Sequence, residues 1–326
     1  MTKRLFKSIL VGIESPQERR QPALQRAAQV AQRTGARLTL FHSAFSSYSV
    51  GPQYYGSTQE KTVAKAIAGH RAALQALATP LRGKGLKVSV KVAWDYPAFE
   101  AIVRETLRTR PDLVVAASHR RAFGARLFLT NTDWQLIRLC PVPLLFVKKQ
   151  RAYGKARVLA AVDPLHTAAK PAHLDRRILE AGAALATAHA GRLDVVHACV
   201  PLSTYTPIYG VGFAPVYDPE LEQQYRRRAQ RALERVSADF EVPARQLHLE
   251  TGSPAGVLPA LARRLRTDVL VMGAVSRRGL QRLLIGSTAE RVLDLLPCDV
   301  LVVKPRGFKT DVPRRYAALQ LDVPPM

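Results

Sequence analysis

The sequence predicts an α/β protein made of two tandem, doubly wound domains, each with a five-stranded parallel sheet and helices on both faces. One observation is an internal repeat: residues 112–148 align without a gap with residues 268–304 and share eleven identities in thirty-seven positions. A repeat of this size indicates a duplicated domain and not a solenoid array. The other is that each half alternates short β-branched segments with longer helical ones, and crossovers of that length require parallel strands.

In the first half we expect strands at residues 7–13, 38–42, 87–92, 113–118 and 144–148. Helices are expected at residues 23–34 and 97–109. Two more are expected to end at residues 82 and 139. The first helix has the clearest boundaries, because Pro22 can open it and Gly35 can close it.

The second half repeats this order, with strands expected at residues 157–162, 192–197, 246–250, 268–273 and 300–304. The predicted domains are residues 1–150 and 156–306, separated by a polar stretch that contains Gly154. Residues 307–326 form a predicted tail, and from residue 305 onward we expect a loosely ordered appendage.

Composition is typical of a globular protein. The chain has 326 residues and is 47% hydrophobic, which is enough for two buried cores. No apolar run approaches the roughly 18 residues of a membrane span and no targeting segment is evident, so a cytoplasmic location is expected. The three cysteines are odd in number and form no CxxC pair, so neither a disulfide framework nor a zinc site is predicted.

The formal net charge is +24 and the pI about 10.6. Such an excess attracts nucleic acid, anionic lipid or a phosphorylated ligand without a specific site. The arginines, however, occur singly or in short groups on predicted helices, as at Arg104, Arg108 and 226–228, which is typical of a solvated face. We therefore expect only nonspecific contact with nucleic acid, and a nucleic-acid-associated basic protein is one alternative.

In open α/β sheets, ligands bind beyond the carboxyl ends of the strands where the winding direction reverses, between the first and fourth strands. In the second half these strands end in small residues, which leave room for a ligand, and in one carboxylate, which could accept hydrogen bonds from a base or ribose. The residues are Ala161, Val162 and Asp163 at one end and Met272 and Gly273 at the other.

A glycine cluster follows the fourth strand. Gly286, Ser287 and Thr288 stand at an expected helix start, and nine residues separate them from Ser276. Free amides and the positive end of the helix dipole would hold a phosphate there, with help from the two hydroxyls. The alternative is that the glycines only turn the chain and that the serine caps the helix.

The run from Met272 to Ser276, the group 286–290 and the closing segment 298–304 resemble the signature of the universal stress protein family. In that signature, two residues separate a first glycine from a second. Nine residues separate the second glycine from a third, which is followed by serine or threonine. Here Ser276 replaces the second glycine. The tandem pair, together with residues 130–134, most resembles the two-domain E type.

The resemblance implies the strand order 3-2-1-4-5 in each domain and adenine-nucleotide binding in some members. By position, the base would contact Asp163 and Ala198, with Ala161 and Val162 alongside. The phosphates would contact Gly273, Ser276, Gly286, Ser287 and Thr288, beside Met272. The expected ligand is ATP or another adenine nucleotide, with or without Mg²⁺, in a stress-response binding protein that is not an enzyme. No nucleophile with a neighbouring base and no metal-ligand set is evident in the sequence.

The first copy departs from this pattern. The constant offset places Ala117 at the position of Gly273, Arg120 at that of Ser276, Thr130 at that of Gly286 and Asn131 at that of Ser287, while Glu14 replaces Asp163. We therefore expect a degenerate cleft in the first half and nucleotide binding only in the second.

Two loops after the second strands, 43–58 and 201–219, hold six of the ten tyrosines as well as Phe45 and Phe213. Loop aromatics near the carboxyl edge can line a cleft or pack on the helix beneath. An apolar or lipid-like ligand is therefore a second alternative. His42 and His197 close equivalent strands, and a structural role is expected for both.

The two fifth strands are apolar edge strands, which favour pairing. In the family, strands at this position pair two domains into a dimer. We therefore expect an internal pseudo-dimer, with residues 144–148 beside residues 300–304, and protein partners that the sequence does not identify.

Overall fold

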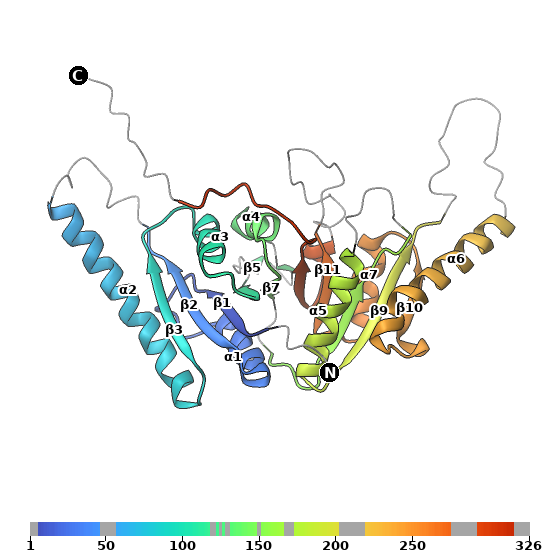
Figure 1. Cartoon of the computed structure of the whole chain (residues 1–326), viewed down its shortest axis with the longest axis horizontal. Helices are drawn as coiled ribbons and strands as arrows, with labels where there is room; N and C mark the ends of the chain where they lie inside the picture. The colour runs from blue at the N-terminus through green and yellow to red at the C-terminus, as the bar shows by residue number, and fades with distance from the viewer. Residues whose placement is uncertain are drawn as a thin grey trace, which may run out of the picture.

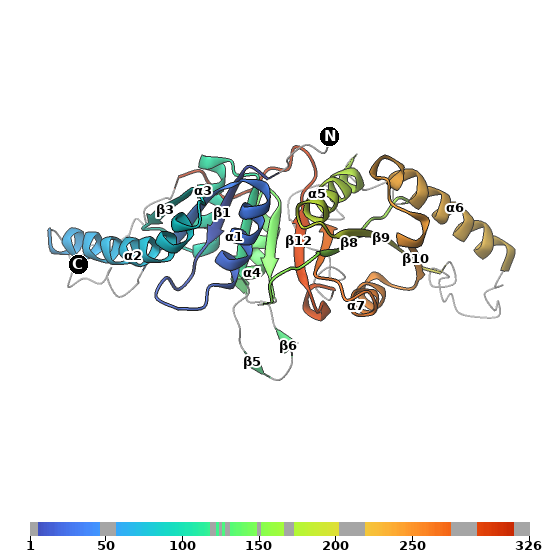
Figure 2. The same ribbon diagram turned by 90° about the horizontal axis from the view of Figure 1, so that it is seen from below.

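The computed structural model describes residues 6–45, 57–117, 122–123, 126–127, 131–148, 151–165, 173–201, 219–274 and 292–315. Within these ranges, one ten-stranded sheet runs through both halves of the molecule (Figures 1 and 2). Its order is β10-β9-β8-β11-β12-β7-β4-β1-β2-β3, which is the expected 3-2-1-4-5 order twice over. The predicted fold class is confirmed.

The first half starts as the sequence predicts. α1 has Pro22 in its first turn, and it ends at Gly35, whose φ of +73° allows its N–H to reach the carbonyl of Ala31. A short hairpin formed by β5 and β6 was not expected. The elements are β1 (Ser8–Gly12), α1 (Pro22–Thr34), β2 (Arg37–Ser43), α2 (Ser57–Gly83), β3 (Val88–Ala93), α3 (Ala98–Thr109), β4 (Leu113–Ala117), β5 (Ala122–Phe123), β6 (Arg126–Leu127), α4 (Asn131–Leu139) and β7 (Leu144–Val147).

The second half has the same order of elements. They are β8 (Arg157–Ala161), α5 (Leu174–Ala188), β9 (Arg192–Cys199), α6 (Pro219–Ser237), β10 (Leu247–Thr251), α7 (Pro254–Arg264), β11 (Val269–Gly273) and β12 (Asp299–Val303). Two short 3-10 segments, Ala238–Phe240 and Ala244–Gln246, lead from α6 into β10. α2 and α6 lie at the two outer ends of the molecule (Figures 1 and 2).

Two hydrophobic cores cover the two faces of the sheet, and each extends through both halves. One contains α1, α2, α5 and α6, and the other contains α3, α4 and α7. Strand residues alternate between them, as at β1, where Ile9 and Val11 enter the first core and Leu10 the second. Because each core is continuous, apolar burial joins the two halves.

β7 and β12 lie side by side and run antiparallel. Leu145 is paired with Leu301, its own equivalent at the 156-residue offset. A local two-fold pseudo-symmetry axis therefore passes through this pair. The expected contact between the two fifth strands is present, and we call it, with the residues that flank it, the seam.

Two buried lysines cross the seam in equivalent ways. Lys148 Nζ donates to the carbonyl oxygens of Leu293 (2.7 Å) and Leu296 (2.9 Å), and Lys304 Nζ donates to that of Arg138 (2.9 Å). Carbonyl groups near a helix end carry partial negative charge, which compensates for a buried ammonium group. Burial lowers the pKa of both lysines, that of Lys304 to about 8.

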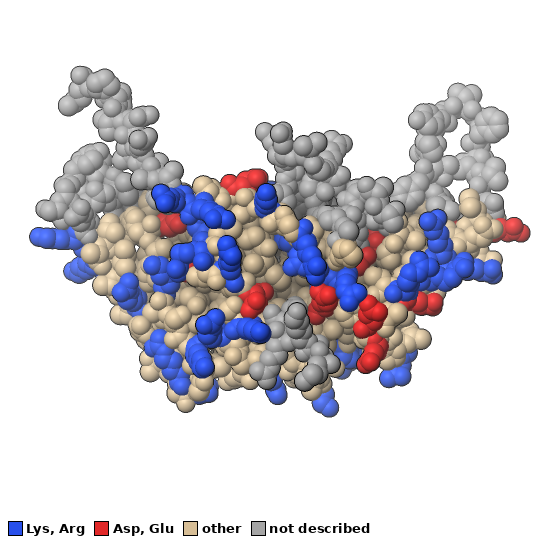
Figure 3. Space-filling model, viewed as in Figure 1, with Lys and Arg blue, Asp and Glu red and all other residues tan. Residues whose placement is uncertain are grey.

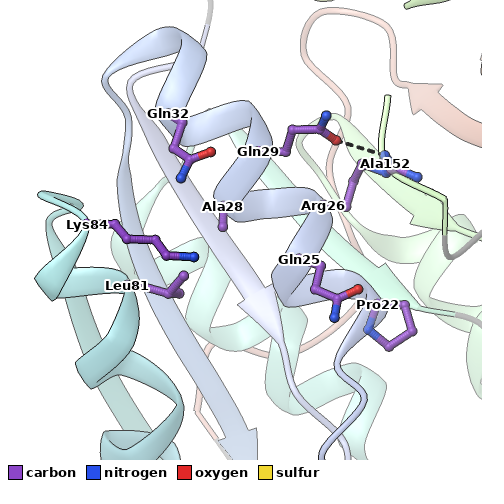
Figure 4. A pocket seen from close by; sticks show the side chains of 9 residues that line it. All are labelled: Pro22, Gln25, Arg26, Ala28, Gln29, Gln32, Leu81, Lys84 and Ala152. Atoms are coloured by element: carbon purple, nitrogen blue, oxygen red, sulfur yellow. Dashed lines mark hydrogen bonds between the residues drawn. The ribbon is translucent and has the colours of Figure 1, made fainter. Parts of the chain in front are cut away.

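A buried polar cluster ties the first half to the second on one side of the seam. Arg26 Nε on α1 donates to Asp299 Oδ2 at the start of β12 (3.0 Å), and the hydroxyl of Tyr153 donates to the same oxygen (2.6 Å). The guanidinium lies over the Tyr153 ring, 3.3 Å from its centroid. It also donates to the side chain of Gln29, one turn along α1 (Figure 4). The linker, expected to be polar, thus contributes a buried aromatic residue.

The expectation of a loosely ordered appendage from residue 305 is wrong as far as residue 315. Residues 305–308 form a turn closed by a hydrogen bond from Phe308 N to Pro305 O, and Val312 is buried in the second core. From β12 the segment leads back over the first half (Figures 1 and 2). Apolar burial holds it there, which a polar composition does not reveal.

Candidate functional site

The candidate cleft of the second half begins where β8 and β11 end. These strands are neighbours, and Met272 lies opposite Ala161 in the register. β9 flanks β8, and β12 flanks β11. The chain therefore reverses its winding between β8 and β11, and the described residues expected on the base side of the site, at the ends of these two strands, lie at this point.

Two side chains fix the backbone at the end of β8. Nδ1 of His197, on β9, lies 3.2 Å from the carbonyl oxygen of Val162 and is the donor, since a carbonyl can only accept. Oδ1 of Asp175, in the first turn of α5, accepts the backbone N–H of Asp163 at 3.1 Å. Sequence reasoning missed Asp175, although an acidic residue in a first helical turn is a recognisable signal.

Asp163 is held so that its carboxylate faces outward. Its side chain is 54% exposed, and its Oδ1 lies 3.7 Å from Nδ1 of the buried His197. Ala161 and Ala198 beside it are only partly buried, whereas Val162 and Met272 are buried. This end of the cleft therefore combines two partly exposed alanines with one exposed carboxylate.

Gly273 has a packing role. A Cβ at this position would lie 2.7 Å from Cδ2 of Leu174 and 3.3 Å from Cδ1 of Ile178. The glycine thus allows α5 to pack closely on the sheet, and a larger residue would have to displace the Leu174 side chain. A contact between Gly273 and a ligand stays a prediction.

The expected phosphate side lies outside the described residues. It comprises Ser276, Gly286, Ser287 and Thr288. The same holds for Arg120 and Thr130 and for the side chain of Asn131 in the first half. The predicted difference in nucleotide binding between the two halves depends on these positions and stays a prediction.

The first half repeats the histidine arrangement. Nδ1 of His42 donates to the carbonyl of Ile13 at 2.8 Å, as His197 does to Val162. Burial and the nearby ring of His70 lower the pKa of His42. Each histidine therefore joins the second strand to the end of the first, which is the structural role expected from their equivalent positions.

An aromatic cluster stands at the carboxyl edge of the first half. The ring of Phe45, from the loop after β2, lies 5.7 Å from that of Trp94 and 5.0 Å from that of Tyr96, which is 55% exposed. Below it, Arg104 holds the buried Asp95 with two hydrogen bonds of 2.8 and 2.6 Å. The other loop aromatics lie outside the described residues.

The positive charge is spread over the molecule. On the face shown in Figure 3, Lys and Arg side chains occur over both halves, with Asp and Glu between them. A denser group lies over α6, where Arg226, Arg227 and Arg228 are exposed. Among the described residues, no group of histidine, cysteine or carboxylate side chains could hold a metal ion. No helix in the described parts is long and apolar enough to cross a bilayer.

Comparison with known proteins agrees with this arrangement. The sequence profile described as the Universal stress protein family matches residues 5–148 and again residues 156–304. The chain belongs to the universal stress protein family. It is a tandem member, with one family domain in each half.

Its relatives share the full tandem length. Universal stress protein E of Escherichia coli strain K12 is 31% identical over 319 residues, which cover 94% of this chain and 97% of that protein. Universal stress protein E of Photorhabdus laumondii is 28% identical over 313 residues, covering 94% and 98%. This universal stress protein is therefore similar to the E type along its whole length.

Solved structures support the fold. A protein of unknown function from Pseudomonas aeruginosa PAO1 is 29% identical and superposes with a TM-score of 0.72, covering 93% of this chain and 94% of that one. A universal stress protein from Archaeoglobus fulgidus, at 16% identity, has a TM-score of 0.63 over 90% of this chain and 98% of that one. The latter likeness concerns the fold alone.

Proposed function

We propose that this universal stress protein is a non-catalytic binding protein of the stress response whose second half holds an adenine nucleotide. The observation that carries the proposal is the end of β8, where the exposed carboxylate of Asp163 follows β8 close to the partly exposed Ala161 and Ala198. Nucleotides bind at this position in doubly wound folds.

Each residue has a role in the proposal. Asp163 accepts hydrogen bonds from the ribose or from the amino group of the base, and the alanines leave room for the flat ring. The described side of the cleft suits a nucleoside because it combines two partly exposed alanines with an exposed carboxylate. Ser276, Gly286, Ser287 and Thr288 would hold the phosphates by main-chain amides and hydroxyls, with or without Mg²⁺.

The geometry gives no support for a reaction. His197, the imidazole nearest to Asp163, donates its Nδ1 proton to the carbonyl of Val162 and is buried. The hydrogen bond orients the backbone, and Nε2, the nitrogen that would have to accept a proton from water, is itself buried. We therefore propose that occupancy of the cleft, and not turnover, is the functional signal.

The test is calorimetry with ATP on the full chain. Asp163→Ala should weaken ATP binding at least tenfold, because a hydrogen bond to a charged group contributes about 1.5–3 kcal/mol. The matched control is Glu14→Ala, which removes the equivalent exposed carboxylate of the first half and should change the affinity less than twofold. Equal effects of the two substitutions, or no heat with the unaltered chain, would contradict the proposal.

A second candidate function is the binding of an apolar small molecule in the first half. The cluster of Phe45, Trp94 and Tyr96 at the carboxyl edge favours it. Organic extraction of the purified protein followed by mass spectrometry should then release a bound acyl compound, and Phe45→Ala should lower its yield. An extract without such a compound would speak against this candidate.

A further inference from the structure

The pseudo-symmetry axis at Leu145 and Leu301 relates two places on the seam, one beside the end of each fifth strand. At the end of β7, the place is filled by the cluster of Arg26, Tyr153 and Asp299. At the end of β12, the corresponding place is a cavity of about 520 Å³. The two places therefore differ although the strands around them are equivalent.

Two substitutions in the duplicated sequence account for the difference. The equivalent strands β2 and β9 begin at Arg37 and Arg192, which are 155 residues apart. The same offset, applied to the preceding helix, places Ala181 at the position of Arg26. The 156-residue offset puts Pro143 in the position of Asp299. Alanine and proline cannot fill the space that an ion pair occupies on the other side.

The cavity has a mixed lining, in which polar groups supply the larger share of the surface and the apolar part is stiff. Four prolines restrict its backbone, so little conformational entropy would be lost on binding. Phe308 is held by the turn at 305–308, in which Gly307 has a φ of +77° that favours glycine. The apolar residues of the lining are Pro111, Pro141, Val142, Pro143, Ala181, Val303, Pro305 and Phe308.

Two guanidinium groups also line the cavity. Arg177 on α5 donates to the main-chain carbonyl of Lys304, and Arg306 stands exposed on the turn. Burial and the nearby charge of Arg306 lower the pKa of Arg177, which indicates that the two cations are close together. Neither forms an ion pair with any residue in the described part of the chain.

Two carboxylates in the lining are engaged elsewhere. Oδ2 of Asp112 accepts the backbone N–H groups of Lys7 and Ser8, each at 2.9 Å. Oε1 of Glu180 accepts from Nε of Arg176 at 3.3 Å. The charge of Glu180 raises the pKa of Arg177 and so offsets part of the effect of burial and of Arg306, but the pKa of Arg177 stays lowered. Among the described residues, neither carboxylate forms an ion pair with the two arginines.

We propose that this seam cavity binds a small molecule in which a phosphate or carboxylate group is attached to an apolar, ring-sized body. The guanidinium groups of Arg177 and Arg306 would take the anion, since arginine matches both groups with paired hydrogen bonds. The proline walls and Phe308 would contact the apolar body. A volume of about 520 Å³ lies within the range of small-molecule sites. This site is separate from the nucleotide cleft at β8 and β11 and does not depend on it.

The test is calorimetry on the full chain with phenyl phosphate and with benzoate, which tells a phosphoryl from a carboxyl ligand. Arg306→Gln should weaken binding of the preferred probe about tenfold, as expected for loss of a charge-assisted hydrogen bond, and Arg306→Glu should abolish it. The matched control is Arg228→Gln, which removes one exposed positive charge from α6 and should change the affinity less than twofold. Arg306 is exposed, so both of its variants should keep the melting temperature and the ATP heat of the parent.

Several results would overturn the proposal. If Arg228→Gln weakens binding as much as Arg306→Gln, the probes respond only to the overall positive charge. If neither probe binds, or if phenol binds as tightly as phenyl phosphate, the cavity is not an anion site. If inorganic phosphate binds as tightly as phenyl phosphate, the apolar walls make no contribution and the assigned ligand class is wrong.

Discussion

Replacing Arg26 by methionine should destabilise the whole chain, because it breaks a buried ion pair that joins the two halves. The side chains of Arg26 and Asp299 are 3% and 0% exposed, and their atoms Nε and Oδ2 are 3.0 Å apart. The substitution keeps the apolar volume of the side chain but removes its charge. The carboxylate of Asp299 would then be buried without this partner.

The size of the stability loss depends on the hydrogen bonds that Asp299 keeps. Breaking a buried pair from one side costs about 3–5 kcal/mol. Asp299 keeps the hydrogen bonds from the Tyr153 hydroxyl (2.6 Å) and from the backbone N–H of Lys148 (2.8 Å). We therefore expect a loss near the lower limit, about 3 kcal/mol in the free energy of unfolding.

Urea-induced unfolding measures this loss. The two tryptophans, Trp94 and Trp134, both lie in the first half, so their fluorescence reports on that half, while far-UV circular dichroism reports on both. The two signals should change together, because the sheet and both cores are continuous. The matched control is Arg33→Met, an exposed arginine on the same helix, which should cost less than about 0.5 kcal/mol.

Adding Asp299→Asn to Arg26→Met should restore part of the lost stability, since it removes the charge left behind. A stability loss in Arg26→Met no larger than that in Arg33→Met would show that this ion pair does not stabilise the fold. A double variant less stable than Arg26→Met alone would show that the charge left on Asp299 is not the cause of the loss.

Three further predictions concern single residues. Gly273→Ala should cost about 1–3 kcal/mol by forcing Leu174 away from the sheet, visible as a lower urea midpoint. Burial and the charges of Arg33 and Arg26 lower the pKa of His189 in the folded protein to about 4. As the pH falls, this histidine is therefore protonated in the unfolded chain before it is protonated in the folded one. Stability should therefore be lost between pH 6.5 and about 4, and His189→Leu should remove about 2–3 kcal/mol of that loss. Burial lowers the pKa of Lys304 to about 8, so stability should rise from pH 8 to 10, and Lys304→Met should abolish this rise.

The sequence predicted the fold because its signals are local or repeated. Pro22 and Gly35 mark the ends of α1, and the aligned fifth strands carry the same apolar pattern. Their pairing followed because an apolar edge strand needs a neighbour. The structural role of His42 and His197 could also be predicted, since the two residues occupy equivalent positions at the ends of equivalent strands.

The contacts that join the halves could not be predicted in the same way. Arg26 and Asp299 are 273 residues apart, and neither has an equivalent in the other copy. Tyr153 stands in a polar linker, and Val312 in a polar tail, where composition predicts exposure. At the cleft, Gly273 was read as room for a ligand, whereas the position of α5 gives it a packing role that one strand cannot reveal.

Native mass spectrometry of the full chain with ATP is the decisive test of nucleotide binding in the second half, because it counts bound nucleotides. We expect one ATP per chain, lost in Gly286→Asp and kept in Thr130→Asp, the equivalent change in the first half. Two nucleotides per chain, none, or a loss caused by Thr130→Asp would contradict it.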